Sequence, residues 1–290
     1  MIDLKNQNNI QQTLSKPITI EGIGLHSGIN VSMKLLPAKA DEGIKFYRTD
    51  LSYGNEIRAI WSNVSNTELS TTISNEVGAS VSTVEHLMSA LSGLHIDNLK
   101  IEINGPEVPI MDGSSKEFVS LIDKVPLKTL SKKRKTIKIK KNIKVIKNDS
   151  FVELKPNNKF SIDFEIDFPS KFISKQSCHL QLINGNYKSD IASARTFGFE
   201  KDVDLLRSKG LALGGSLRNA VVIGEDKILN EEGLRFKDEF VRHKILDSIG
   251  DLYLAGFPIQ GYFFGNKSGH FLNNLILKSL FSDESNYEFV

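Results

Sequence analysis

Apolar residues recur along this chain with two different spacings, which predicts a mixture of strands and helices. In residues 99–103 and 160–168, apolar and polar side chains alternate, as in a strand with one buried face. Apolar positions three and four residues apart, typical of a helix face, occur in residues 82–91, 115–122, 240–254 and 272–280. Further strands are predicted at residues 17–20, 31–36, 44–47, 136–140 and 260–264.

A lysine-rich segment separates two halves of similar plan. Residues 124–147 are dense in lysine, and we interpret residues 128–135 as a basic linker. The linker would join an N-terminal α+β domain, residues 1–127, to a C-terminal α+β domain, residues 136–290. We therefore expect an α+β fold with two similar layered sheet-and-helix domains packed face to face and the active site between them. The alternative for the lysines is a patch that attracts an anionic substrate or a membrane surface.

The composition is that of an ordinary globular protein. Of 290 residues, 40% are hydrophobic and 25% are charged, and the net charge of +2 gives no global bias toward nucleic acid. The single cysteine, Cys178, excludes an intrachain disulfide and fits a reducing compartment. The polar residues 1–9 do not resemble a signal peptide, and no run of about 18 apolar residues suggests a membrane span. We expect a soluble, cytoplasmic protein.

Two segments far apart in the sequence carry candidate metal ligands. His243 and Asp247 are four residues apart in a predicted helix, so both side chains lie on one face. Glu85 and His86 could supply a general base and a third ligand, which would complete a hydrolytic zinc site. The alternative for His243 and Asp247 is an ordinary surface pair on an amphipathic helix.

Glu85 has a competing structural interpretation. Residues 82–85 read Ser-Thr-Val-Glu, which matches a capping box in which Glu85 would bond back to the start of the helix. His86 would then lie in the first turn, where the helix dipole favours the neutral imidazole that a metal requires.

His270 is the remaining candidate for proton transfer. It follows Ser268-Gly269, and we expect it on a loop, where the alternative is an exposed histidine without function. A general acid at this position needs a carboxylate to hold its tautomer and raise its pKa. Asp251, one helical turn beyond Asp247, is the candidate.

Other enzyme classes lack their motifs in this chain. The sequence contains neither His-Glu-x-x-His nor Cys-x-x-Cys, and its glycine-rich segments match no phosphate loop or dinucleotide fingerprint. Kinase, NTPase and dehydrogenase functions are therefore disfavoured. His26, flanked by Gly24 and Gly28, either faces a ligand or caps a turn.

Taken in order, the motifs closely resemble those of the zinc-dependent UDP-3-O-acyl-N-acetylglucosamine deacetylases of lipid A biosynthesis. The resemblance extends from about residue 18 to residue 280. Its landmarks are Gly-Ile-Gly-Leu-His-Ser-Gly at 22–28, Ser-Thr-Val-Glu-His-Leu at 82–87, Pro-Ile-Met-Asp-Gly-Ser at 109–114, Ala-Arg-Thr-Phe-Gly-Phe at 194–199, Asp-Glu-Phe-Val-Arg-His-Lys at 238–244 and Lys-Ser-Gly-His at 267–270.

The resemblance implies a role for each matching residue. The metal ligands for one Zn²⁺ per chain would be His86, His243 and Asp247. The catalytic residues would be Glu85 as general base, His270 as general acid held by Asp251, Thr196 as a hydrogen-bond donor to the tetrahedral intermediate, and Lys244 at the substrate diphosphate. The substrate-binding residues would be His26, Phe197 and Lys244. An insert at residues 199–224 would form an apolar passage for the acyl chain.

The family also implies the partners and leaves alternatives to test. The expected partner is UDP-3-O-acyl-N-acetylglucosamine, with no nucleic acid, no stable membrane insertion, at most transient contact with a membrane surface, and a monomeric state. Fe²⁺ suits the same donors as Zn²⁺. The alternatives are a zinc amidohydrolase with another substrate, a zinc-stabilised interaction module, and a nucleic-acid binder using residues 124–147. The single cysteine disfavours the module, and the net charge disfavours the nucleic-acid binder.

Overall fold

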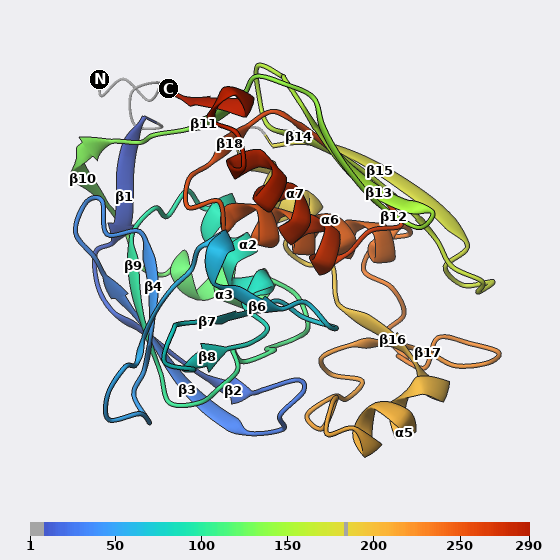
Figure 1. Ribbon diagram of the computed structural model, residues 1–290. Helices are drawn as coiled ribbons and strands as arrows, with labels where there is room; N and C mark the ends of the chain where they lie inside the picture. Colours follow the sequence, from blue (N-terminus) through green and yellow to red (C-terminus); the bar gives the residue numbers. More distant parts are fainter. Residues whose placement is uncertain (1–8, 183–184) are drawn as a thin grey trace.

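Two five-stranded sheets form the outer layers of the protein, and helices lie between them (Figure 1). The computed structural model describes residues 9–182 and 185–290. The strand order in the N-terminal half is β2-β3-β9-β4-β5. These strands are β2 (Ile18–Ile23), β3 (Asn30–Pro37), β9 (Leu99–Ile103), β4 (Ile44–Arg48) and β5 (Glu56–Arg58).

The second sheet repeats the topology of the first. Its order is β12-β13-β19-β14-β15, with β12 (Ile143–Lys147), β13 (Ser150–Lys155), β19 (Tyr262–Asn266), β14 (Ser161–Asp167) and β15 (Lys175–Gln181). In each sheet the third and fourth strands are parallel and the other neighbours are antiparallel. The expected α+β fold, with two similar layered halves, is therefore confirmed.

Alternation along the strands decides which face of each sheet meets the helices. In β9, Leu99, Ile101 and Ile103 are fully buried, whereas Lys100 and Glu102 lie on the outer face and pair at 2.8 Å. Burying three aliphatic side chains removes their apolar surface from water, which favours this orientation of the strand.

The central layer contains α2 (Glu85–Gly93), α3 (Lys116–Ile122), α6 (Glu239–Tyr253) and α7 (His270–Phe281). Helices α2 and α6 touch at Gly250, where an added β-carbon would lie 2.0 Å from the carbonyl oxygen of Glu85. Glycine therefore permits a backbone contact that any side chain would prevent. This contact brings the first turn of α2 beside the middle of α6.

Short strands and helices join and close these layers. Two of the short sheets have two strands: β1 (Ile10–Leu14) pairs with β10 (Leu127–Lys133), and β16 (Phe197–Phe199) pairs with β17 (Val221–Ile223). The other two have three strands: β7 (Thr72–Ser74) lies between β6 (Val64–Asn66) and β8 (Ser80–Val81), and β11 (Ile137–Ile139) lies between β18 (Ile259–Gln260) and β20 (Tyr287–Phe289). The remaining helices are α4 (Asn186–Asp190), α5 (Glu200–Ser208), η1 (Trp61–Asn63) and η2 (Glu284–Asn286).

The segment interpreted as a basic linker contains a strand. Most of residues 128–135 belongs to β10, which pairs antiparallel with β1. Arg134 then forms an ion pair with Asp97 at 2.7 Å. The strand escaped prediction because nearly all of its side chains are exposed, so the sequence shows no buried alternation.

The insert expected at residues 199–224 is a separate lobe of the C-terminal half. It runs from the end of β16 through α5 to β17, and Figure 1 shows it apart from the two sheets. Three of its five leucines are exposed, Leu205 by 58%, Leu213 by 50% and Leu217 by 44%. Within the described residues, no helix combines the length and the apolar character that a membrane span requires.

Candidate active site

The candidate site lies where the first turn of α2 faces the middle of α6. Glu85 and His86 begin α2, while His243, Asp247 and Asp251 follow each other at four-residue intervals along α6. The four-residue spacing places the three α6 side chains on one face of the helix. The sequence prediction that these two segments meet is confirmed geometrically.

The capping-box interpretation of Glu85 was wrong. Val84 occupies the N-cap position, with no capping hydrogen bond from its side chain, and Thr83 has a left-handed φ of 56°. Instead of bonding back to the helix start, the Glu85 carboxylate accepts a hydrogen bond from the backbone N–H of Thr71 at 3.0 Å. The strained turn at Thr83 thus leaves Glu85 directed into the site.

His86, His243 and Asp247 form a cluster that could hold a metal ion. One ligand atom from each residue lies within 4.8 Å of the others, and all three side chains are buried. Asp247 Oδ1 is 3.2 Å from His243 Nε2 and 3.5 Å from His86 Nε2. Two imidazole nitrogens and a carboxylate oxygen therefore point at one small volume.

The tautomer of His243 is fixed by the backbone. His243 Nδ1 lies 3.1 Å from the carbonyl oxygen of Ala194, which can only accept a hydrogen bond. Nδ1 must therefore carry the proton, and Nε2 offers its lone pair to the cluster. Burial lowers the pKa of His243 to about 3, despite the opposing charge of Asp247, so the ring is neutral at pH 7.

Asp247 is the anionic member of the cluster. Burial alone would raise its pKa, but the neighbouring His243 and Lys244 hold this pKa well below its usual range. Lys244 Nζ lies 2.7 Å from Asp247 Oδ2. Lys244, expected to contact the substrate diphosphate, lines the pocket but here directs its ammonium group to Asp247.

His270 and Asp251 form a second polar pair beside the cluster. His270 Nδ1 lies 2.8 Å from Asp251 Oδ2, and His270 Nε2 lies 4.0 Å from Glu85 Oε1. Burial would lower the pKa of His270, but the charge and hydrogen bond of Asp251, together with the charges of Glu85 and Asp247, outweigh burial and raise this pKa to about 9. Burial raises the pKa of Glu85. The structure thus places a cationic imidazole next to a carboxylate that binds protons more readily than usual.

His270 was expected on a loop, and this expectation was wrong. It is the first residue of α7, and Gly269 in front of it is extended. The helix holds the imidazole in a buried position, 9% exposed, rather than leaving it in solvent.

A cavity of about 280 Å³ opens beside the metal-ligand cluster. Its walls include His26, Phe197 and Lys244, which were expected to bind substrate, and Thr196, which was expected to donate to the tetrahedral intermediate. Thr196 is held by backbone hydrogen bonds to Gly113 and Val221, at 2.7 and 2.8 Å. Phe197 packs its ring edge against Phe240, with centroids 5.0 Å apart.

His26 lies on a loop that a buried carboxylate fixes. Glu107, fully buried, accepts hydrogen bonds from the backbone N–H groups of His26 and Ser27 at 2.9 and 2.8 Å. Both ring nitrogens of His26 are buried and lack a hydrogen-bond partner among the residues that the structure describes. The His26 ring is therefore available to a ligand in the cavity.

Sequence reasoning missed the residues that hold the proton-transfer groups in place. Thr71 bonds to both Glu85 and Asp251, and Asn273 donates to Asp251. Glu107 accepts hydrogen bonds from Thr83 and His26, and the Ala194 carbonyl fixes His243. None of these residues belongs to a helical or metal-ligand spacing with its partner. The short segment containing Ala194 and Thr196 offered the only signal, through its place in the matched motifs.

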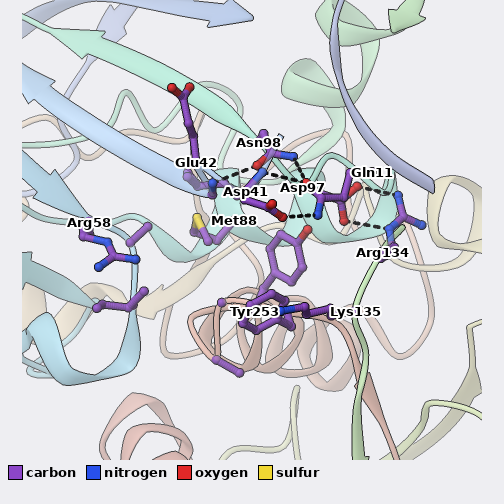
Figure 2. Close-up of a pocket in the computed structure, with 17 residues that line it drawn as sticks. Gln11, Asp41, Glu42, Arg58, Met88, Asp97, Asn98, Arg134, Lys135 and Tyr253 are labelled. Atoms are coloured by element: carbon purple, nitrogen blue, oxygen red, sulfur yellow. Dashed lines mark hydrogen bonds and ion pairs between the residues drawn. The ribbon is translucent and has the colours of Figure 1, made fainter. Parts of the chain in front are cut away.

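A larger cavity, of about 370 Å³, lies at the C-terminal end of α6 (Figure 2). Tyr253 and Met88 contribute to its wall, and Figure 2 shows Arg134 beside Asp97 and Gln11 beside Asp41. These side chains bind each other: Arg134 Nε is 2.7 Å from Asp97 Oδ1, and Gln11 Nε2 is 2.7 Å from Asp41 Oδ1. We call this the rear cavity.

Comparison with known proteins gives one consistent result. The sequence model of the family described as UDP-3-O-acyl N-acetylglycosamine deacetylase matches residues 11–282. A protein of Syntrophus aciditrophicus named UDP-3-O-acyl-N-acetylglucosamine deacetylase is 48% identical over 277 residues, which is 96% of this chain and 88% of the relative. Proteins of the same name from Haemophilus ducreyi and Geobacter sp. are 48% and 49% identical, over 97% and 93% of this chain and 92% and 88% of their own.

Proposed function

Because the chain belongs to the UDP-3-O-acyl N-acetylglycosamine deacetylase family, we infer that the cavity between α2 and α6 is where it hydrolyses its substrate. The protein is a hydrolase of lipid A biosynthesis. It removes the N-acetyl group of UDP-3-O-(3-hydroxyacyl)-N-acetylglucosamine and releases acetate and UDP-3-O-acyl-glucosamine. The observation that supports the site most strongly is the convergence of His86, His243 and Asp247 beside Glu85 and His270.

The proposed cofactor is one Zn²⁺ per chain. Two neutral imidazoles and one carboxylate are the ligand set of many hydrolytic zinc sites, which keep a further position open. The donors of His86, His243 and Asp247 fit this ion, since His243 Nε2 is free of a proton and Asp247 is ionised. Bound there, zinc supplies a Lewis acid that polarises the acetamide carbonyl and makes a water molecule more acidic.

Glu85 is the proposed general base. One oxygen of its carboxylate is occupied by the Thr71 N–H, so the other, Oε1, is the one that accepts a proton from the attacking water. A raised pKa suits this task, because a base works best when its pKa approaches the working pH.

His270 is the proposed acid on the other side of the reacting carbon. Asp251 keeps it protonated and oriented, so Nε2 can stabilise the developing oxyanion and deliver a proton to the leaving sugar amine. Thr196 would donate a hydrogen bond to the same oxyanion. Once the substrate is bound, Lys244 would exchange its contact with Asp247 for the diphosphate.

The substrate would extend from the zinc ligands along the insert. His26 and Phe197 line the cavity and are proposed to contact the sugar, whereas the leucine-rich insert is proposed to hold the acyl chain. A substrate without the 3-O-acyl group should then react much more slowly. We further propose that the enzyme acts as a cytoplasmic monomer whose two domains, residues 1–127 and 136–290, meet at this site.

Deacetylation of UDP-3-O-acyl-N-acetylglucosamine tests this function directly. Acetate release should stop when a chelator removes the metal and return when Zn²⁺ is added back. Adding back Fe²⁺ or Zn²⁺ at the same concentration and comparing acetate release would identify the more effective ion. A folded, zinc-loaded protein that releases no acetate from this substrate would contradict the substrate assignment while leaving the metal site intact.

A further inference from the structure

Thr71 contacts both Glu85 and Asp251, the carboxylate that holds His270, although it lies outside every motif that the sequence offered. It is buried, 1% exposed, and immediately precedes β7. Its backbone N–H donates to Glu85 Oε2 at 3.0 Å, and its hydroxyl donates to Asp251 Oδ1 at 2.6 Å. Its carbonyl accepts the N–H of Val84, at the start of α2, at 3.3 Å. A single residue therefore bonds to the helix start, to Glu85 and to Asp251.

The Thr71 hydroxyl completes the hydrogen bonding of Asp251. The other carboxylate oxygen, Oδ2, faces His270 Nδ1 at 2.8 Å and accepts from Asn273 Nδ2 at 2.9 Å. With Oδ1 held by Thr71 and Oδ2 held by Asn273, the carboxylate has little freedom to rotate. His270 therefore meets an acceptor of fixed direction, which fixes the plane of its own ring.

The backbone N–H of Thr71 sets the orientation of Glu85 in the same way. Because Oε2 is held by Thr71, Oε1 is the oxygen that faces His270 Nε2, at 4.0 Å. The gap between Glu85 and His270 is the space in which the proposed reaction takes place. Both of its sides are thus fixed by one residue.

We propose that Thr71 is a positioning residue for the deacetylation, acting through Asp251 on His270 and through its backbone on Glu85. The inference rests on the function proposed above for these two groups. Thr71 is buried and is not among the described residues that line the cavity, so it orients the reacting groups without touching the substrate.

Replacing the hydroxyl alone separates positioning from general stability. Thr71→Val keeps the shape and the backbone N–H but loses the hydrogen bond to Asp251. Thr71→Ser keeps the backbone N–H and the hydroxyl that bonds to Asp251. We expect Thr71→Val to lower kcat roughly 10- to 100-fold, with KM and metal content unchanged. Thr71→Ser should stay within about threefold of the wild type, the small change expected when the hydrogen bond is retained. Thr71→Ala replaces the valine variant if that protein does not fold.

Thr13 provides a matched control. Thr13 lies in β1, outside the site, and is equally buried, 1% exposed. Its hydroxyl accepts a hydrogen bond from the N–H of Ala38 at 3.0 Å. Thr13→Val should lower the unfolding temperature but leave kcat unchanged. Equal losses of kcat in Thr13→Val and Thr71→Val would show that a buried hydroxyl matters only for stability, which would overturn the proposal.

A double-mutant cycle with Asp251→Asn tests whether Thr71 acts through Asp251. If it does, Thr71→Val should cost little further activity in the Asp251→Asn background, because the shared route is already broken. If the losses of the two single variants multiply in the double variant, the two residues act independently, and the proposal that Thr71 acts through Asp251 is overturned. A rise in KM without a fall in kcat would also overturn it.

A spectroscopic measurement keeps this inference separate from the proposed function. The His270 Nδ1–H proton, assigned in NMR spectra with His270→Gln, should shift in Thr71→Val and remain in place in Thr71→Ser. If the wild type deacetylates nothing, the proposed function fails and this signal alone decides whether Thr71 positions His270. An unchanged signal in Thr71→Val would overturn the inference.

Discussion

The cavity of the site, beside the middle of α6, and the rear cavity, at the C-terminal end of this helix, differ in a way that explains why only one suits catalysis. The rear cavity is the larger, about 370 Å³ against about 280 Å³, and has several charged side chains in its wall. Two of its charged residues, Arg134 and Asp97, pair with each other, however, and Asp41 accepts a hydrogen bond from Gln11. In the site, His86, His243 and Asp247 point three acceptor atoms at one place. Convergence of like groups therefore distinguishes a reactive cavity better than volume or charge does.

Removing one of the proposed metal ligands should cause the largest loss of activity among these variants. His243→Ala should abolish metal retention and acetate release, because two remaining donors hold a cation far less tightly than three. Metal content by elemental analysis and acetate release measure the two losses. His179→Ala is the matched control, since His179 lies on the outer face of the second sheet and is 66% exposed. Full metal content and activity in His243→Ala would exclude this residue from the site.

Replacing Glu85, the proposed base, should separate metal binding from catalysis. Glu85→Gln keeps the shape and the bond from Thr71 but cannot accept a proton, so kcat should fall roughly 10²- to 10⁴-fold. Metal content should remain that of the wild type. Loss of the metal from Glu85→Gln would instead make Glu85 a ligand or a structural support.

The charge on His270 should appear in the pH dependence. With a pKa of about 9, His270 is protonated at neutral pH and loses its proton as the pH rises through that value. A bound dication nearby would lower this pKa, so kcat/KM should fall at or somewhat below pH 9. His270→Gln should lose this limb and react roughly 10²-fold more slowly. An alkaline limb that persists unchanged in His270→Gln would assign it to another group.

A substitution in the rear cavity should lower stability and leave activity nearly unchanged. Asp97→Asn removes the charge that pairs with Arg134, so the free energy of unfolding should fall by about 1–3 kcal/mol. Acetate release should stay within about twofold of the wild type, because only small effects are expected from a change remote from the reacting groups. Urea unfolding and the standard assay measure the two quantities. A loss of activity at unchanged stability would give the rear cavity a functional role.

Periodic segments of the fold could be predicted from the sequence, and segments defined by distant pairing could not. The helix expected at residues 240–254 is α6, displaced by one residue at each end, because its apolar stripe is set locally. Beyond residue 280 the sequence predicts no element, yet residues 284–289 form η2 and β20, and β20 pairs with β11. Backbone pairing with a remote strand stabilises such a segment whatever its own pattern.

The site divides along the same physical line. His243 and Asp247 could be predicted because four-residue spacing is visible in the sequence. The orientation of Glu85 could not, since it depends on the left-handed turn at Thr83 and on the N–H of Thr71. Contacts of this kind form only after folding, so they cannot be predicted from a pattern in the sequence.

The ligands of the proposed metal come from both halves of the chain, and this has a consequence for how the protein assembles. His86 belongs to the N-terminal half, whereas His243 and Asp247 belong to the C-terminal half. Neither half alone can offer three donors, so a cation would bind tightly only after α2 and α6 have docked. By mass action, metal at a thousand times its dissociation constant would then stabilise the docked chain by about 4 kcal/mol. The metal ion that supports catalysis would therefore also stabilise the folded chain, because it would bind tightly only to chains in which the two halves have packed together.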